Sequence, residues 1–317
     1  MGMTELEKIC KKLILFGGKG GVGKTTCAAA AALHFAEIGR ETLIISSDPT
    51  PSLSDVFGKQ VGPVERPIEP FRKLHALEIS SDLVLQRWKE RYGQEVYEVI
   101  SSFVPVEYDI VDYVGGAPGI EEEYMLGFIL DIVKSGRYDS VVWDTAPAGH
   151  TLNLLGMPQR FLSHLEAAVK VYTKVYASLH KLRLALGLSE GKRSALDIIN
   201  GWKALAKEVM EFITDSSSTE FIITMIPEAL GIEVTKRILA TLNDFGIKVN
   251  NIIINNVITE VDCKLLQARR KMQMEYINRI RSMLDQTTSI TIVPMFSYEI
   301  RGIDALRQVA GILFTDT

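Results

Sequence analysis

The sequence predicts an α/β protein, a doubly wound and mostly parallel sheet with an inserted helical subdomain. Short apolar runs rich in β-branched residues alternate along the chain with segments of helical periodicity, as strands joined by crossover helices do. Residues 153–212 break this alternation because they are mostly helical in pattern and fit no strand–helix repeat. We therefore expect one domain over residues 1–317, with a helical subdomain formed by residues 81–134 and 153–212.

The composition is that of ordinary globular proteins. The 317 residues are 47% hydrophobic and 23% charged, and a net charge of −4 leaves no basic stripe, so we expect no nucleic-acid partner. Three scattered cysteines, Cys10, Cys27 and Cys263, argue for a reducing compartment rather than a disulfide framework. The N-terminus lacks a signal-peptide core, and no apolar run reaches about 18 residues, so we expect a cytoplasmic protein.

The stretch LILFGGKGGVGKTT, residues 13–26, contains the P-loop pattern in its required context. A predicted buried strand over residues 13–16 leads through a glycine-rich turn into a predicted helix over residues 24–38. The glycines let backbone N–H groups surround a phosphate, Lys24 would reach the β- and γ-phosphates, and the Thr25 hydroxyl would coordinate Mg²⁺. The pattern therefore predicts the core of a P-loop NTPase.

A second lysine, Lys19, lies inside this loop. A cation placed so early in the loop cannot easily turn back onto the γ-phosphate of its own nucleotide. We interpret Lys19 as a residue that reaches across a two-fold interface to a partner's nucleotide, as an arginine finger does in trans. The alternative is a solvated surface lysine.

Two further predicted strands, residues 42–46 and 138–143, lead into carboxylates. Functional groups of α/β sheets gather where strands end. Asp48 is therefore a candidate for positioning the attacking water, although Asp-Pro is also a common turn. Asp144 has a Walker-B-like position and would hold Mg²⁺ beside Thr25, through water.

The rest of the chain continues the alternation of strands and helices. Residues 60–70 lack periodicity and predict a loop, and the stretch GGAPG at residues 115–119 separates two helices. The other predicted elements are strands at residues 71–79, 220–225, 251–257 and 290–293, helices at residues 81–103, 120–134, 234–243 and 261–284, a C-terminal helix, and a switch loop at residues 145–150.

The predicted helical segment at residues 153–212 carries an apolar face. Its leucine, valine and tyrosine positions recur at helical spacing, and two glycines, Gly187 and Gly191, interrupt it. This face either packs as core against the sheet or forms a hydrophobic groove for a ligand helix.

The stretches GKGGVGKTT, SSDPTPSLSDVFG, DTAPAGHTL and VPMFSYEIRGIDAL resemble, in order, the motifs of the ArsA family of deviant-Walker P-loop ATPases. This family contains arsenite-pump ATPases and the ATPases that target tail-anchored membrane proteins. The resemblance implies an ATP hydrolase that binds ATP and Mg²⁺. Because the motifs occur once, whereas the bacterial pump ATPases usually carry two fused copies, it also implies a homodimer with facing nucleotides.

The resemblance assigns roles to individual positions. Lys19 would cross the dimer, Asp48 would orient the attacking water, and Asp144 would couple Mg²⁺ to movement of the switch loop. Asn255 would contact adenine, and Glu228 would touch the nucleotide. The adenine would be bordered by Pro294, Met295 and Phe296. The residues expected around the phosphates and Mg²⁺ are Gly18, Lys19, Gly20, Gly21, Val22, Gly23, Lys24, Thr25 and Thr26.

The chain also departs from the family pattern. Thr50 and Pro51 replace the usual alanine and histidine after the Asp-Pro pair. Leu266 stands where targeting ATPases often have the second cysteine of a C-x-x-C pair, so a four-thiolate zinc site across the dimer would lose half its ligands. We therefore expect no zinc. The scattered cysteines also provide no visible thiol set for As(III), a soft ion that prefers thiolates.

We therefore expect a homodimeric ATPase that captures the transmembrane helix of a tail-anchored client in a hydrophobic helical groove and delivers it to a membrane. A membrane receptor is a further candidate partner. The alternative is an arsenite-stimulated ATPase that energises an arsenical efflux pump. A nucleotide-dependent scaffold or partitioning protein is a third class, which usually lacks so large a helical insertion.

Overall fold

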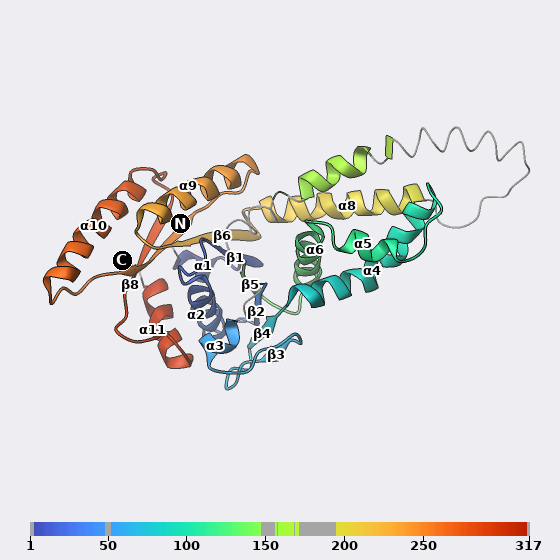
Figure 1. Ribbon diagram of the computed structural model, residues 1–317. Helices are drawn as coiled ribbons and strands as arrows, with labels where there is room; N and C mark the ends of the chain where they lie inside the picture. Colours follow the sequence, from blue (N-terminus) through green and yellow to red (C-terminus); the bar gives the residue numbers. More distant parts are fainter. Residues whose placement is uncertain are drawn as a thin grey trace, which may run out of the picture. The chain divides into compact units, whose positions relative to one another are not determined.

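The computed structural model confirms the α/β class, with an eight-stranded sheet and flanking helices (Figure 1). The strand order is β3-β4-β2-β5-β1-β6-β7-β8, and neighbouring strands are parallel except for β3 and β4. The structure describes residues 3–47, 52–146, 156, 158–167, 169–170 and 195–315.

The bounds of the strands and helices follow the alternation expected from the sequence. The strands are β1 (Leu13–Gly17), β2 (Thr42–Ser46), β3 (Arg66–Pro67), β4 (Leu74–Glu78), β5 (Ser140–Asp144), β6 (Thr219–Met225), β7 (Asn251–Val257) and β8 (Ser289–Pro294). The helices are α1 (Glu5–Lys8), α2 (Lys24–Glu37), α3 (Leu53–Phe57), α4 (Ser81–Ser101), α5 (Ile110–Gly115), α6 (Ile120–Lys134), α8 (Ala195–Thr214), α9 (Ala229–Asp244), α10 (Lys264–Arg281) and α11 (Ile303–Leu313).

The chain divides into two compact units. The first, here called the sheet unit, comprises Met1–Ser80, Asp131–Leu152 and Ile213–Thr317. The second, called the helical unit, comprises Ser81–Leu130 and Asn153–Phe212. Among the described helices, none combines the length and the apolarity that a membrane span requires.

The core of the sheet unit lies on both faces of the sheet, because its central strands are buried on both sides. Ile14, Phe16 and Ile222 face the core layer that contains α2 and α11. The run of small alanines in α2 lets this helix lie close to the strands, with α11 beside it (Figure 1). On the other face α9 covers β6, where the Thr235 hydroxyl contacts the Met225 sulfur at 3.5 Å.

The register of three parallel strands brings their carboxyl ends to one place. Phe16 of β1 and Ser46 of β2 both pair with Asp144 of β5. The loops that follow these strands therefore begin side by side, as the topology of a parallel sheet requires for a site at this edge.

Several short elements were missed by the sequence prediction, and the largest boundary error was at the start of α9. Helix α9 begins at Ala229 rather than residue 234, because Gly231 lets the first turn press against the Ile226 carbonyl, 2.4 Å from where a Cβ would stand. The predicted loop at residues 60–70 contains the two-residue β3, which pairs with β4. Helices α1, α3 and α5 are too short, at four to six residues, to leave a clear periodic pattern.

The helical unit contains α4, α5, most of α6 and α8, and a helical stretch at residues 158–167. Gly115, at the end of α5, lets Trp88 of α4 pack closely, since a Cβ there would lie 3.0 Å from the indole ring. Residues 171–194 of the predicted helical segment, with Gly187 and Gly191, lie outside the described residues.

Candidate nucleotide-binding site

The loop between β1 and α2 has a backbone path that requires glycine at two positions. Gly18 and Gly23 have φ angles of 150° and 91°. A Cβ would lie 2.1 Å from the Thr224 carbonyl oxygen at Gly18, and 2.3 Å from Asn255 Nδ2 at Gly23. The loop therefore lies against residues near the carboxyl ends of β6 and β7, with no room for side chains at these two positions. The N-terminus of the 14-residue α2 follows directly, and such a terminus attracts phosphate.

A hydroxyl and a carboxylate meet at the start of α2. Asp144, at the end of β5, is fully buried, and its Oδ2 accepts hydrogen bonds from Thr25 Oγ1 at 2.7 Å and Ser46 Oγ at 3.1 Å. Ser52 Oγ lies 3.3 Å from Thr25 Oγ1. Hard oxygen ligands of this kind suit Mg²⁺, which also takes ligands from substrate phosphates. The donor set therefore fits the metal predicted from the sequence.

A pocket of about 320 Å³ opens beside the loop, within the size range of small-molecule sites. Asn255 lines it, and its Nδ2 donates a hydrogen bond to the Val22 carbonyl at 2.9 Å, which ties the end of β7 to the loop. The other residues that line this pocket are Gly21, Gly23, Thr26, Cys27, Val56, Asn256, Val293, Phe296, Tyr298, Glu299, Ile300 and Val309.

Comparison with known proteins agrees with this geometry. Residues 11–315 match the family model described as anion-transporting ATPase, the ArsA ATPases. The chain belongs to the ArsA ATPase family. It is 31% identical to the ATPase get3 of Schizosaccharomyces japonicus over 97% of this chain and 94% of the relative. The ATPase ASNA1 homolog of Dictyostelium discoideum is 31% identical over 95% of this chain and 89% of the relative. The ATPase GET3A of Arabidopsis thaliana is 30% identical over 98% of this chain and 86% of the relative.

The chain is therefore an ATP hydrolase, and ATPases of this family bind nucleotide with Mg²⁺. The predicted P-loop residues lie together in the sheet unit. Lys24 begins α2 and is 5% exposed, and Thr26 lines the pocket. Lys19 is half-buried, and its side chain forms no hydrogen bond or ion pair with the part of the chain that the structure describes.

Two predicted elements fall partly or wholly outside the described residues. Asp48 lies there, with its neighbours at positions 49–51. Of the predicted switch loop, residues 147–150 also lie there, but its start is fixed, because the Thr145 hydroxyl donates to the Phe16 carbonyl at 2.8 Å. The switch loop thus begins after β5, and its first residue is hydrogen-bonded to β1, the strand that leads into the P-loop.

The predicted adenine-bordering segment is only partly at the pocket. Phe296 lines the pocket, whereas Pro294 and Met295 are not among the lining residues. Met295 is 47% exposed, and its backbone N–H donates to the Val257 carbonyl at 2.8 Å. The segment therefore extends the pairing of β8 with β7 before Phe296 turns toward the pocket.

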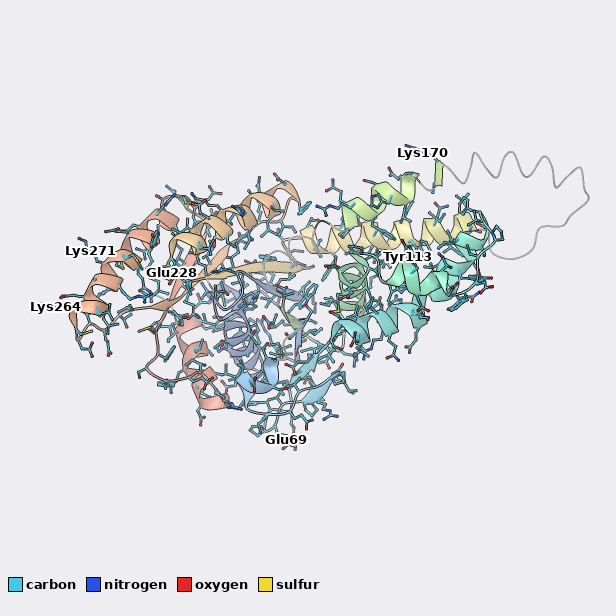
Figure 2. The ribbon with its side chains drawn as sticks, viewed as in Figure 1. Glu69, Tyr113, Lys170, Glu228, Lys264 and Lys271 are labelled. Atoms are coloured by element: carbon cyan, nitrogen blue, oxygen red, sulfur yellow. The ribbon has the colours of Figure 1, made fainter. Side chains whose placement is uncertain are left out.

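Glu228 lies apart from the pocket-lining residues. It occupies the N-cap position of α9, and its Oε1 lies 3.6 Å from Arg269 Nη2 of α10 (Figure 2). The structure thus gives Glu228 a partner on α10 and does not place it against the P-loop. Its transfer from the family pattern stays a prediction.

The three thiols do not converge. Cys10 and Cys263 are exposed, and Cys27 is buried in α2. Burial, together with the negative charge of Asp144, raises the pKa of the Cys27 thiol to about 12, so it stays protonated and is a poor ligand for soft ions. Among the described residues, no three His, Cys, Asp or Glu side chains are arranged to hold a metal. The expected absence of zinc stays a prediction.

The sequence reasoning missed residues that brace the site. Ser46 and Ser52 contact the Asp144–Thr25 pair, and Gln273 of α10 holds the turn after β7. Gln273 Nε2 donates to the Asn256 carbonyl at 3.0 Å and its Oε1 accepts from the Ile258 N–H at 2.8 Å. The position of Ser46 as the last residue of β2 was an available signal, whereas Gln273 sits in a helix with no local mark of this role.

Proposed function

We propose that this ATPase is a cytoplasmic homodimer that captures the transmembrane helix of a tail-anchored membrane protein in its helical unit and delivers it to a membrane. One observation carries the proposal: the same chain holds a P-loop site in one unit and, in the other, an apolar pocket lined by Trp88, Tyr92, Phe161 and Trp202. The similarity to the get3 and ASNA1 ATPases over nearly the whole chain supports it.

ATP hydrolysis at such a site depends on positioning and charge neutralisation. The Lys24 ammonium would neutralise the β- and γ-phosphates, and Asp48 would orient and polarise the attacking water. Thr25 and Asp144 would hold Mg²⁺, which supplies further charge neutralisation on the phosphate oxygens when bound. Asn255 and Phe296 would contact the base side of the nucleotide, and Thr26 would lie with the P-loop residues around the phosphates.

Coupling between the two activities would use the chain itself. The strand that ends at Asp144 is followed by residues 145–152, which lead directly into the helical unit at residue 153. A change at the metal or the γ-phosphate would therefore have a short path along the chain to the client-binding unit. Order and disorder of switch segments is a common way to couple nucleotide state to binding.

The alternative, an arsenite-stimulated pump ATPase, is not favoured. As(III) requires several thiolates, and here the thiols are two exposed cysteines on separate elements and one buried, protonated cysteine. Measuring ATP turnover with and without arsenite separates the two functions. No stimulation is expected.

A labelled peptide of about 20 apolar residues, the length of a membrane span, tests client capture. We expect the protein to hold the peptide in solution when ATP is bound and to release it after hydrolysis. Asp48→Asn should bind ATP, retain the peptide and fail to release it. If the peptide binds in neither nucleotide state, the targeting function is wrong.

Subunit mixing tests the dimer and the role of Lys19. Lys19→Ala and Asp48→Asn should each be inactive as homodimers. In a mixed dimer, one site would have its own Asp48 and the partner's Lys19, so mixing should restore about one quarter of the wild-type rate, since half of the dimers are mixed and each has one working site. If Lys19 acts within its own subunit, mixing restores nothing.

A further inference from the structure

The helical unit contains a pocket of about 180 Å³ with one acidic side chain in it. Helices α4, α5, α6 and α8 and the helical stretch at residues 158–167 all contribute to its wall. The lining residues are Trp88, Tyr92, Val96, Val99, Ile100, Val114, Ile120, Glu123, Phe161, Trp202 and Leu205. Glu123, from the first turns of α6, is the acidic one, and it also borders the neighbouring smaller pocket.

Glu123 is half-buried and has no partner among the described residues. No hydrogen bond or ion pair joins its carboxyl group to them, and burial alone raises its pKa to about 8. A carboxyl group that is partly removed from water is costly to ionise when no partner offsets its charge. A cationic ligand would therefore stabilise the ionised form of this carboxyl group.

The other titratable groups near the pocket leave this role to Glu123. Tyr92 is the titratable lining residue on α4, and no charged residue lines the pocket from α5, α8 or residues 158–167. Glu95 lies on α4 but is engaged, because its Oε2 accepts a hydrogen bond from Trp202 Nε1 at 2.8 Å. Glu123 is thus the acidic group open to the pocket.

The walls favour a cation with an apolar stem. The rings of Trp88, Tyr92 and Trp202 offer π faces, which attract ammonium and guanidinium groups, and the aliphatic residues suit the methylene stem of such a side chain. A volume of about 180 Å³ is far smaller than that of a 20-residue helix, which is about 30 Å long and 10–12 Å wide with its side chains. The pocket therefore fits one side chain rather than a whole helix.

We propose that this pocket receives a lysine or arginine side chain of the bound client helix, with Glu123 as its counter-ion. The inference rests on the proposed targeting function and adds a selection rule to it. A basic residue within an apolar segment is costly to bury alone, in protein as in lipid, so a carboxylate inside the receiving unit stabilises the clients that carry one.

Two matched peptides test this inference on the full-length protein with ATP. Both are apolar helices of about 20 residues without tryptophan, one with a central lysine and the other with methionine. Trp88 and Trp202 line the pocket, whereas the third tryptophan, Trp143, is buried in β5 of the sheet unit, so intrinsic fluorescence reports on the pocket. At pH 8 we expect the lysine peptide to bind at least about tenfold more tightly than the methionine peptide.

The carboxyl group is tested by substitution and by pH. Glu123→Gln should remove the preference for lysine, while Glu121→Gln, on the same helix but outside the pocket lining, should keep it. Because binding of the cation requires the ionised carboxylate, wild-type affinity for the lysine peptide should rise about tenfold between pH 7 and pH 9. Glu123→Gln should show no such rise, and circular dichroism checks that it folds.

The possible outcomes separate the two proposals. If both peptides bind equally and Glu123→Gln changes neither, the targeting function stands and the selection rule is overturned. If neither peptide binds in any nucleotide state, the targeting function fails, and the client-side-chain assignment fails with it. Binding of hexylamine is measured in the same way. If hexylamine binds as tightly as the lysine peptide and its binding is lost in Glu123→Gln, the ligand is a free amine rather than a client residue.

Discussion

The sheet unit and the helical unit each hold a carboxyl group that is largely removed from water, and the surroundings of the two groups differ. Asp144 is fully buried at the end of β5 and accepts hydrogen bonds from two hydroxyls, those of Thr25 and Ser46. Glu123 lies among aromatic and aliphatic side chains without a partner in the described residues. The first arrangement is organised before the substrate arrives, as catalysis by positioning requires. The second is incomplete until a ligand supplies the missing charge.

The largest expected effect is in the sheet unit, on Lys24. Lys24→Ala removes the ammonium that we propose neutralises the phosphates, so we expect ATP turnover to fall by about 10³-fold or more. Steady-state phosphate release measures this. Lys12→Ala, an exposed lysine before β1, is the matched control and should turn over ATP at the wild-type rate. Normal turnover by Lys24→Ala would remove the P-loop from catalysis.

The next effect concerns Asp144. Asp144→Asn keeps the shape of the side chain but removes its charge, so we expect turnover to fall roughly 10²-fold and the Mg²⁺ requirement to shift to higher concentration. A Mg²⁺ titration of the rate measures both. Asp139→Asn, at the opposite end of the same strand, should leave the titration unchanged. An unshifted titration for Asp144→Asn would place the metal elsewhere.

A smaller effect is expected in the helical unit from the unpaired carboxyl group. Burial raises the Glu123 pKa from 4.5 to about 8, so between these values the folded state holds a proton that the unfolded state has lost. The free energy of unfolding therefore falls as pH rises, by about 2 kcal/mol between pH 6 and pH 7.5, because unfolding releases this proton. Denaturant unfolding of wild-type and Glu123→Gln measures the difference. If both lose the same stability over this range, Glu123 is not buried as described.

Substitution of Gly23 in the P-loop should destabilise the protein more than substitution of Gly21. Gly23→Ala combines a φ of 91° with a Cβ 2.3 Å from Asn255 Nδ2, whereas Gly21→Ala has a φ of 75° and no atom within 4 Å. We expect Gly23→Ala to cost about 1–2 kcal/mol more in unfolding free energy than Gly21→Ala. Adding Asn255→Ala to Gly23→Ala should recover part of the difference. Equal costs would mean that the contact with Asn255 does not constrain the loop.

The smallest expected effect is a difference in how fast the three cysteines react with an alkylating reagent. Iodoacetamide at pH 8 should label Cys10 and Cys263 within minutes and leave Cys27 unlabelled, because the Cys27 thiol is buried and its pKa is raised to about 12. Mass spectrometry of digested protein locates the label. Rapid labelling of Cys27 in the native protein would show that α2 opens at this position.

The sheet unit could be predicted from sequence because its signals are local. The P-loop spacing, the alternation of strands and helices and the carboxylate after β5 each lie within a few residues, and the family resemblance joined them in order. Ser46 and Ser52 were missed because their contacts depend on how β2 and β5 are paired, which no local pattern records.

The helical unit was less predictable for the same reason. Glu123 stands in a run of three glutamates at the start of α6, where acidic residues ordinarily favour the helix terminus and face solvent. Only the packing of α4 and α8 around it shows that one of the three lines a pocket. The packing of an apolar face on several helices is a tertiary property, so the sequence left open whether that face formed core or a groove.

The hydrogen bond from Asn255 to the Val22 carbonyl joins positions 233 residues apart. This hydrogen bond restrains the P-loop, because the loop cannot move away from β7 unless the bond breaks. The spacing between the pocket beside Asn255 and the P-loop is therefore held by the protein itself. With this distance fixed, a nucleoside diphosphate whose base occupied the pocket would not reach the position of the third phosphate of a triphosphate. The site would therefore distinguish the two nucleotides by their length.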